Sequence, residues 1–423
     1  MKMRVLMGAA FALCIAATAN AQPKTTGPAP QLPGPRIASP LAPKAVSPAP
    51  GVPAEPAHEL TASDLGAWLD GFVPYAIARA DIAGAEVVVV KDGAVLFEKG
   101  YGVSDVKTQA PVDPKRTQFR PGSISKLFTW TSVMQLVEQH KIDLDADINT
   151  YLDFKIPPAY GKPITMRDLM THRPGFEETI KNLLATDTKD LVPLREALVR
   201  WVPERMFPPG EVPAYSNYGA ALAGYIVQRV SGEPFEEYVE RHIFAPLHMD
   251  HSTFRQPLPK ALAGDMSKGY MLASGDPKPY ELVPMSPAGA LATTGDDISR
   301  FMLAHLNNGS YGGAQILKPE TARMMHGRVY PVPAGTLAMG LGFYHEDRNG
   351  IDIVGHGGDT VYFHSDLHLI LEKGIGFYVS QNSAGKPGLG LRGPLFAAFM
   401  KRYFPAPKAA ALPTLKTARQ DGA

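Results

Sequence analysis

The stretch PGSISKLFTW, residues 121–130, places a serine, Ser123, three positions before a lysine, Lys126. The apolar residues that follow recur at intervals of three and four, which predicts a buried helix that opens at Ser123: Leu127, Trp130, Met134 and Val137. Residues three apart lie on the same side of a helix, so the Lys126 amine would lie beside the Ser123 hydroxyl. A serine becomes a useful nucleophile only when a base is within hydrogen-bond reach. The stretch therefore predicts Ser123 as a nucleophile and Lys126 as its proton-transfer partner.

The Ser-x-x-Lys spacing alone is a weak signal, because it occurs twice more, at Ser104…Lys107 and Ser383…Lys386. Prolines follow both of these pairs closely, and they argue against a helix that would hold the lysine beside the serine. By spacing alone, Ser123 fits the role of a plain helix cap equally well. The choice between cap and nucleophile depends on the rest of the chain.

A second motif, Tyr215-Ser216-Asn217, lies immediately before a predicted helix over 217–230. A buried tyrosine beside a lysine ammonium is expected to lose its proton more easily than free tyrosine does. Asparagine offers both a donor and an acceptor for orienting a substrate amide. The alternative interpretation is a core tyrosine followed by an asparagine that caps the helix.

A third motif, Gly355-His356-Gly357-Gly358-Asp359, ends a predicted strand over 351–354. Paired glycines allow the backbone of a substrate to approach the edge of a strand closely. The imidazole of His356 would then be placed to donate a hydrogen bond. The alternative interpretation is a tight turn that carries a surface histidine.

Together, in this order and spacing, the three motifs resemble those of class C β-lactamases and their relatives, which include esterases, D-aminopeptidases and D-Ala-D-Ala carboxypeptidases. The resemblance covers about residues 60–403, and four further matches support it: Thr171–Gly175, Phe207–Gly210, Pro246–Met249 and Pro287–Leu291. It implies a serine hydrolase that forms an acyl-enzyme and that needs neither a metal nor an organic cofactor. The implied catalytic residues are Ser123, Lys126 and Tyr215. The implied substrate-binding residues are Asn217, His356, Gly357 and Gly358, and the amides of Ser123 and Asp359 would form the oxyanion hole.

One departure from this family pattern bears on the substrate. Class C β-lactamases have Lys-Thr-Gly where this chain has His356-Gly357-Gly358. A permanent cation suited to a substrate carboxylate is thus replaced by a titratable ring that is mostly neutral at pH 7. The expected substrates are small-molecule esters or peptides ahead of β-lactams, and β-lactam turnover is expected to improve as the pH falls toward 6.

The order of predicted elements indicates an α+β fold of the β-lactamase/transpeptidase type. Strands are predicted near both ends of the folded part, at 85–90, 94–100, 351–354, 363–371 and 375–381. The middle of the chain has helical spacing, and helices are also predicted at 61–79, 296–307 and 389–403. We therefore expect one antiparallel sheet built from both chain ends, flanked by helices, with an inserted mainly helical subdomain.

Composition divides the 423 residues into four parts. Residues 1–21 read as a signal peptide with a positive start and a small-x-small cleavage site, which predicts export to the periplasm or the exterior. Residues 22–58 are rich in Pro and Ala and predict a disordered linker. The hydrolase domain is expected over 59–404, with a flexible tail at 405–423.

Charge and cysteine content exclude several classes of protein. The formal net charge is +1, and loss of Lys2 and Arg4 with the signal peptide would change it to −1, which gives no support for nucleic-acid binding. No later segment is apolar enough to predict a membrane span, and the oligomeric state is left open. The single cysteine, Cys14, lies in the predicted signal peptide, so the mature chain would have no thiol for catalysis or for a metal.

Three competing classes of protein remain to be weighed. An α/β-hydrolase would need a Gly-x-Ser-x-Gly elbow, which the chain lacks. A zinc hydrolase would need a helical His-Glu-x-x-His motif, whereas His364 and His368 lie in a predicted strand. A non-catalytic binding module with the same fold is the more serious alternative, although such a module usually lacks the serine, lysine or tyrosine.

Overall fold

The computed structural model describes residues 57–330 and 338–406 of the chain. The predicted signal peptide, nearly all of the predicted linker and most of the predicted tail lie outside the described residues, and these assignments stay predictions. Within the described residues, no helix is both long and apolar enough to cross a membrane.

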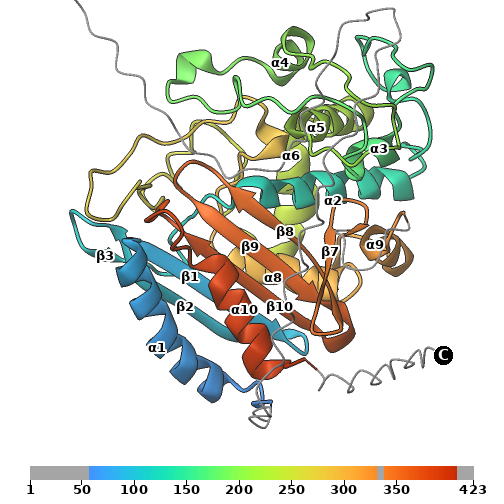
Figure 1. Cartoon of the computed structure of the whole chain (residues 1–423). Helices are drawn as coiled ribbons and strands as arrows, with labels where there is room; N and C mark the ends of the chain where they lie inside the picture. The colour runs from blue at the N-terminus through green and yellow to red at the C-terminus, as the bar shows by residue number, and fades with distance from the viewer. Residues whose placement is uncertain (1–56, 331–337, 407–423) are drawn as a thin grey trace, which may run out of the picture. The chain divides into compact units, whose positions relative to one another are not determined.

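An eight-stranded antiparallel sheet forms the centre of the fold, in the order β3-β2-β1-β10-β9-β8-β7-β6 (Figure 1). Its strands are β1 (Gly84–Lys91), β2 (Ala94–Asp105), β3 (Ala110–Pro111), β6 (Ala338–Met339), β7 (Tyr344–Arg348), β8 (Ile351–Asp359), β9 (His364–Ile370) and β10 (Ile375–Gln381). The N-terminal strands pair with the C-terminal strands where β1 meets β10. The prediction of one antiparallel sheet from both chain ends is confirmed.

Helices cover both faces of this sheet (Figure 1). The first and last helices, α1 (Ala62–Ala80) and α10 (Arg392–Tyr403), share one face, and the intervening chain supplies the other. That intervening chain contains α2 (Ser125–Glu138), α3 (Met166–Met170), α4 (Leu194–Arg200), α5 (Asn217–Ser231), α6 (Phe235–Val239), α7 (Ala245–Leu247), α8 (Gly295–Leu306), α9 (Pro319–His326) and the small hairpin β4 (Ser310–Tyr311) and β5 (Ala314–Gln315). The prediction of an inserted, mainly helical region is confirmed.

The central strand β1 carries a run of four valines, Val87–Val90, because both of its faces are buried. Successive side chains of a strand point to opposite faces of the sheet. Val88 and Val90 accordingly join the large core around α2, α5 and α8, whereas Val87 and Val89 join the smaller core beneath α1 and α10. The strand therefore links the two cores.

Most predicted bounds of helices and strands agree with the structure. The differences occur where contacts between distant segments determine where an element begins or ends. Thr165 and Asp168 form a capping box, but the helix that it opens has only five residues. Ser123 lies in a 3₁₀ turn, η1 (Gly122–Ile124), that leads into α2, instead of within the helix itself. Strand β8 continues through the His356 motif to Asp359, because the motif pairs with β9 throughout. Strand β7 was not predicted.

Gly122 fixes where the nucleophile-bearing turn meets the sheet. Its φ of +56° lies in the left-handed region. A Cβ at this position would lie 2.5 Å from the amide nitrogen of Asp359, at the end of β8. Only glycine therefore allows the turn before Ser123 to lie directly against the strand.

We expect Gly122→Ala to destabilise the protein more than Gly161→Ala does. Gly161 also has a positive φ of +65°, but a Cβ there would meet no atom within 4 Å. Gly161→Ala should cost about 1–2 kcal/mol for the backbone conformation alone. Gly122→Ala should cost roughly 1–3 kcal/mol more, because its Cβ also overpacks against β8. Urea unfolding of both variants measures the difference, and equal losses would show that the contact with β8 is not tight.

Candidate active site

The structure brings together the three residues that the sequence predicts as catalytic. Ser123 comes from η1, Lys126 from the first turn of α2, and Tyr215 from the segment that precedes α5. The Lys126 Nζ lies 2.9 Å from the Ser123 Oγ, and the Tyr215 hydroxyl donates to the same Oγ at 2.6 Å. Both side chains that could move a proton thus contact the serine oxygen directly.

Lys126 is fully buried, and its surroundings favour the neutral amine. Burial lowers the pKa of Lys126 to about 7, although the negative charge of Glu178 acts in the opposite direction. Besides Ser123, Nζ contacts two acceptors, the Asn217 Oδ1 at 2.7 Å and the Ala288 carbonyl at 2.6 Å. A neutral amine can donate its two hydrogens to these acceptors and keep its lone pair for the Ser123 hydroxyl. Lys126 is therefore arranged to act as a base near neutral pH.

The expectation that Tyr215 would lose its proton easily is wrong. Burial raises the pKa of Tyr215 well above its ordinary value, and the hydrogen bond with Ser123 offsets only part of this effect. The Lys126 Nζ lies 4.8 Å from the centre of the Tyr215 ring. A lysine that is neutral near pH 7 supplies little positive charge to stabilise a phenolate. Tyr215 is accordingly a phenol that donates to Ser123.

Asn217 is held by a residue that the sequence did not indicate, Glu178. The Glu178 carboxylate accepts from the backbone amide of Asn217 at 2.9 Å and from its Nδ2 at 2.7 Å. This orients the Asn217 oxygen toward Lys126. Glu178 lies in a loop without a periodic pattern, so only the tertiary structure identifies its partner.

His356 lies beside the three catalytic candidates, but it does not behave as the sequence predicts. Its ring centroid lies 6.5 Å from that of Tyr215 and 4.9 Å from that of Tyr344. Burial, with a smaller effect of the charge of Lys126, lowers the pKa of His356 to about 3. The ring therefore stays neutral at pH 6, so protonation of His356 gives no reason to expect β-lactam turnover to improve on acidification.

Gly358 of the third motif allows β8 to lie against the turn that carries Ser123. A Cβ on Gly358 would lie 1.8 Å from the Pro121 carbonyl oxygen and 2.8 Å from the Ser123 amide nitrogen. A Cβ on Gly357 would point to the other face, 2.9 Å from a carboxylate oxygen of Asp366. Gly358 is thus required for the close approach to Ser123, and Gly357 lies away from it.

The backbone amide of Asp359 lies on the edge of β8 that faces Ser123. The next residue, Thr360, donates its amide to the Phe363 carbonyl at 2.9 Å, so these two residues form a hydrogen-bonded pair in the turn between β8 and β9. Because amides alternate between the two edges of a strand, the Asp359 amide points away from β9. The amides of Ser123 and Asp359, predicted as a pair, therefore lie across the same narrow gap.

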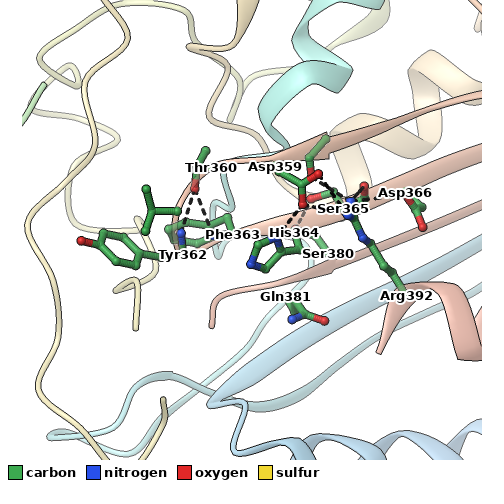
Figure 2. Close-up of polar contacts among 12 residues, drawn as sticks. Asp359, Thr360, Tyr362, Phe363, His364, Ser365, Asp366, Ser380, Gln381 and Arg392 are labelled. Atoms are coloured by element: carbon green, nitrogen blue, oxygen red, sulfur yellow. Dashed lines mark hydrogen bonds and ion pairs between the residues drawn. The ribbon is translucent and has the colours of Figure 1, made fainter. Parts of the chain in front are cut away.

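The Asp359 side chain takes part in an ionic cluster on β9 and α10 (Figure 2). Its oxygens contact the His364 Nδ1 at 2.5 Å and the Arg392 guanidinium at 2.8 Å. Burial alone would raise the pKa of Asp359, but the contacts with His364 and Arg392 hold it below its usual range. The carboxylate is therefore ionised at neutral pH. Among the described residues, no group of three or more His, Cys, Asp or Glu side chains is arranged to hold a metal ion.

Comparison with known proteins identifies the family of the chain. The family model described as Beta-lactamase matches residues 54–398, which include all of the site residues named above. The chain belongs to this family. Membership supports a function of the serine-hydrolase type.

The relatives are distant. The chain is 27% identical over 246 residues to Protein flp of Staphylococcus aureus (strain N315), covering 56% of this chain and 48% of that one. It is 28% identical over 267 residues to PbpX of Bacillus subtilis (strain 168), which is named for penicillin binding, covering 61% of each chain. The chain thus spans about half the length of the first relative. Among solved structures, the octameric penicillin-binding protein homologue from Pyrococcus abyssi matches with a TM-score of 0.65 and 26% identity, over 80% of this chain and 76% of that one. The predicted fold type is confirmed.

The buried amine predicts the pH dependence of the site. Because Lys126 acts as a base only when neutral, kcat/KM for an ester should rise about tenfold per pH unit below about pH 7 and level off above it. Glu178→Gln removes a charge that favours the ammonium, so the midpoint should move to lower pH. Glu177→Gln, which removes the neighbouring carboxylate, serves as the control and should leave the midpoint in place. A midpoint that does not respond to Glu178→Gln would remove Lys126 as the titrating base.

Proposed function

We propose that this protein is an exported hydrolase that cleaves short-chain carboxylic esters through an acyl-enzyme on Ser123. The observation that carries the proposal is the double contact of the Ser123 oxygen, with the Lys126 amine on one side and the Tyr215 phenol on the other. A helix cap would need neither partner. Export rests on the predicted signal peptide alone.

The proposed reaction has two balanced steps. The Ser123 oxygen bonds to the substrate carbonyl carbon while its proton passes to the neutral Lys126 amine. Collapse of the tetrahedral intermediate breaks the ester bond, and the proton returns to the leaving alkoxide from Lys126 or through Tyr215. A water molecule then attacks the acyl-enzyme by the same route and releases the carboxylic acid. The amides of Ser123 and Asp359 would stabilise the negative oxygen in both steps.

The charges around the site support uncharged esters over β-lactams. His356 is neutral and thus offers no cation to a substrate carboxylate. The ionised Asp359 carboxylate at the end of the same strand is paired with the Arg392 guanidinium at 2.8 Å, so this pair offers no free cation either. The carboxylate of a penicillin would therefore find no cation in the His356 motif, whereas a neutral ester needs none.

Covalent labelling tests the nucleophile. A fluorophosphonate should modify Ser123, and Ser123→Ala should abolish both labelling and ester turnover. Ser125→Ala is the matched control, because this neighbouring serine is buried and donates its hydroxyl to the Gly122 carbonyl at 2.5 Å. Mass spectrometry of the adduct decides the position. An active enzyme labelled elsewhere would overturn the assignment, and a stable penicillin adduct without ester turnover would favour a penicillin-binding module.

Substrate preference tests the role of the His356 motif. Short-chain nitrophenyl esters should be cleaved with higher kcat/KM than nitrocefin or penicillin. His356→Lys should raise β-lactam turnover by about ten- to a hundredfold, since a charge-assisted hydrogen bond contributes roughly 1.5–3 kcal/mol. Ester turnover should change much less. An equal change for both substrate classes, or faster β-lactam cleavage by the unmodified enzyme, would contradict the assignment.

A further inference from the structure

Glu281 is a buried carboxylate close to the proposed active site, and no sequence motif indicates it. The residue is 3% exposed and lines two adjoining cavities of about 380 and 490 Å³. Both of its carboxylate oxygens are already bound by the chain. Oε2 accepts from the Thr360 hydroxyl at 2.5 Å, and Oε1 accepts from the Val361 amide at 2.6 Å. Because both oxygens of Glu281 bind Thr360 and Val361, the side chain fixes the conformation of this short segment.

The segment held by Glu281 directly follows Asp359, whose amide faces Ser123. The Thr360 hydroxyl also accepts from the amides of Tyr362 at 3.3 Å and Phe363 at 3.0 Å (Figure 2). It therefore connects Glu281 to the turn between β8 and β9. On the side that precedes Asp359, Arg392 donates to the Gly358 carbonyl at 3.1 Å. Side-chain hydrogen bonds therefore hold the backbone on both sides of the Asp359 amide, at Gly358 and at Thr360.

Glu281 is also connected to the other side of the gap. Arg120, which is fully buried and lies three residues before Ser123, donates to the backbone carbonyl of Glu281. Its guanidinium stacks over the ring of Tyr280, 4.5 Å from the ring centre. The side chain of Glu281 thus contacts the segment that follows Asp359. Its backbone carbonyl contacts the segment that precedes Ser123.

From these contacts we propose that Glu281 is a positioning residue that sets the separation and direction of the two oxyanion-hole amides. This inference rests on the proposed acyl-enzyme function. Donors stabilise an oxyanion only when they lie about 2.7–3.1 Å from the place where the charge develops. A misplacement of about 1 Å can cost about a hundredfold in rate. Glu281 would act through Thr360 and Val361, without touching the substrate.

Two substitutions test the proposal. Glu281→Gln replaces one acceptor oxygen by an NH₂ group and so breaks one of the two hydrogen bonds, while Thr360→Val removes the hydroxyl partner. Each should lower kcat for a short-chain ester by about tenfold or more with KM within about twofold, because only the charge-developing state is affected. The double variant should lose less than the sum of the two single losses, since both substitutions affect the contact between Glu281 and Thr360. The pH midpoint assigned to Lys126 should not move.

A transition-state probe separates positioning from a general loss of structure. Phenylboronic acid accepts the Ser123 oxygen at boron and becomes tetrahedral, so its affinity should fall by the same factor as kcat/KM. Asp297→Asn is the matched control, because buried Asp297 likewise accepts from a hydroxyl, that of Ser252 at 2.7 Å, and from a backbone amide, that of His251 at 2.9 Å. It should lower the melting temperature but leave kcat and boronate affinity unchanged.

The outcomes distinguish this inference from the proposed function. Glu281→Gln and Thr360→Val variants that lose stability but keep kcat and boronate affinity would overturn the positioning role while the hydrolase assignment stands. A wild-type protein that neither cleaves esters nor reacts at Ser123 would overturn the proposed function. Hydrogen exchange then tests whether Glu281 holds the backbone around Asp359 in place. Faster exchange at the Asp359 and Val361 amides in Glu281→Gln supports it, and unchanged exchange refutes it.

Discussion

The close contact between the turn that carries Ser123 and the end of strand β8 is the constraint on which the site depends. Two glycines make it possible, because a Cβ on Gly122 or on Gly358 would overlap the backbone of the facing segment. The contact joins the start of the helical insertion to the C-terminal half of the sheet. It therefore places the proposed nucleophile, on the 3₁₀ turn before α2, beside a strand edge whose amides are not all used by neighbouring strands. The catalytic geometry follows from this packing of backbone on backbone.

The second consequence of this packing is electrostatic. Lys126 is enclosed between the insertion and the sheet, and the loss of hydration brings its pKa to about 7. Glu178 moderates this effect without cancelling it, because it contacts Asn217 instead of the amine directly. The same burial keeps Tyr215 protonated and His356 neutral. Burial thus gives the three side chains different states: an amine that titrates near neutral pH, a protonated phenol and a neutral imidazole.

The sequence by itself determined the type of fold and the reactive groups. Alternation and helical spacing predicted strands at both ends of the chain and the helix that opens near Ser123, because these signals depend only on neighbours a few residues apart. The three motifs also predicted that Ser123, Lys126 and Tyr215 would meet, and their side chains do lie within hydrogen-bond distance. The end of α5 is also set locally, because Gly232 adopts the left-handed conformation that glycine allows.

Only the tertiary structure decided the protonation states and the supporting contacts. Desolvation depends on what covers a group from every direction, so the sequence missed the high pKa of Tyr215 and the low pKa of His356. Glu178 and Glu281 were missed for a related reason. Their partners lie far along the chain, and no local periodicity connects an acid in a loop with an amide that the fold brings beside it. Local sequence patterns predict which side chains react, whereas burial and long-range hydrogen bonds determine whether each of these side chains is protonated.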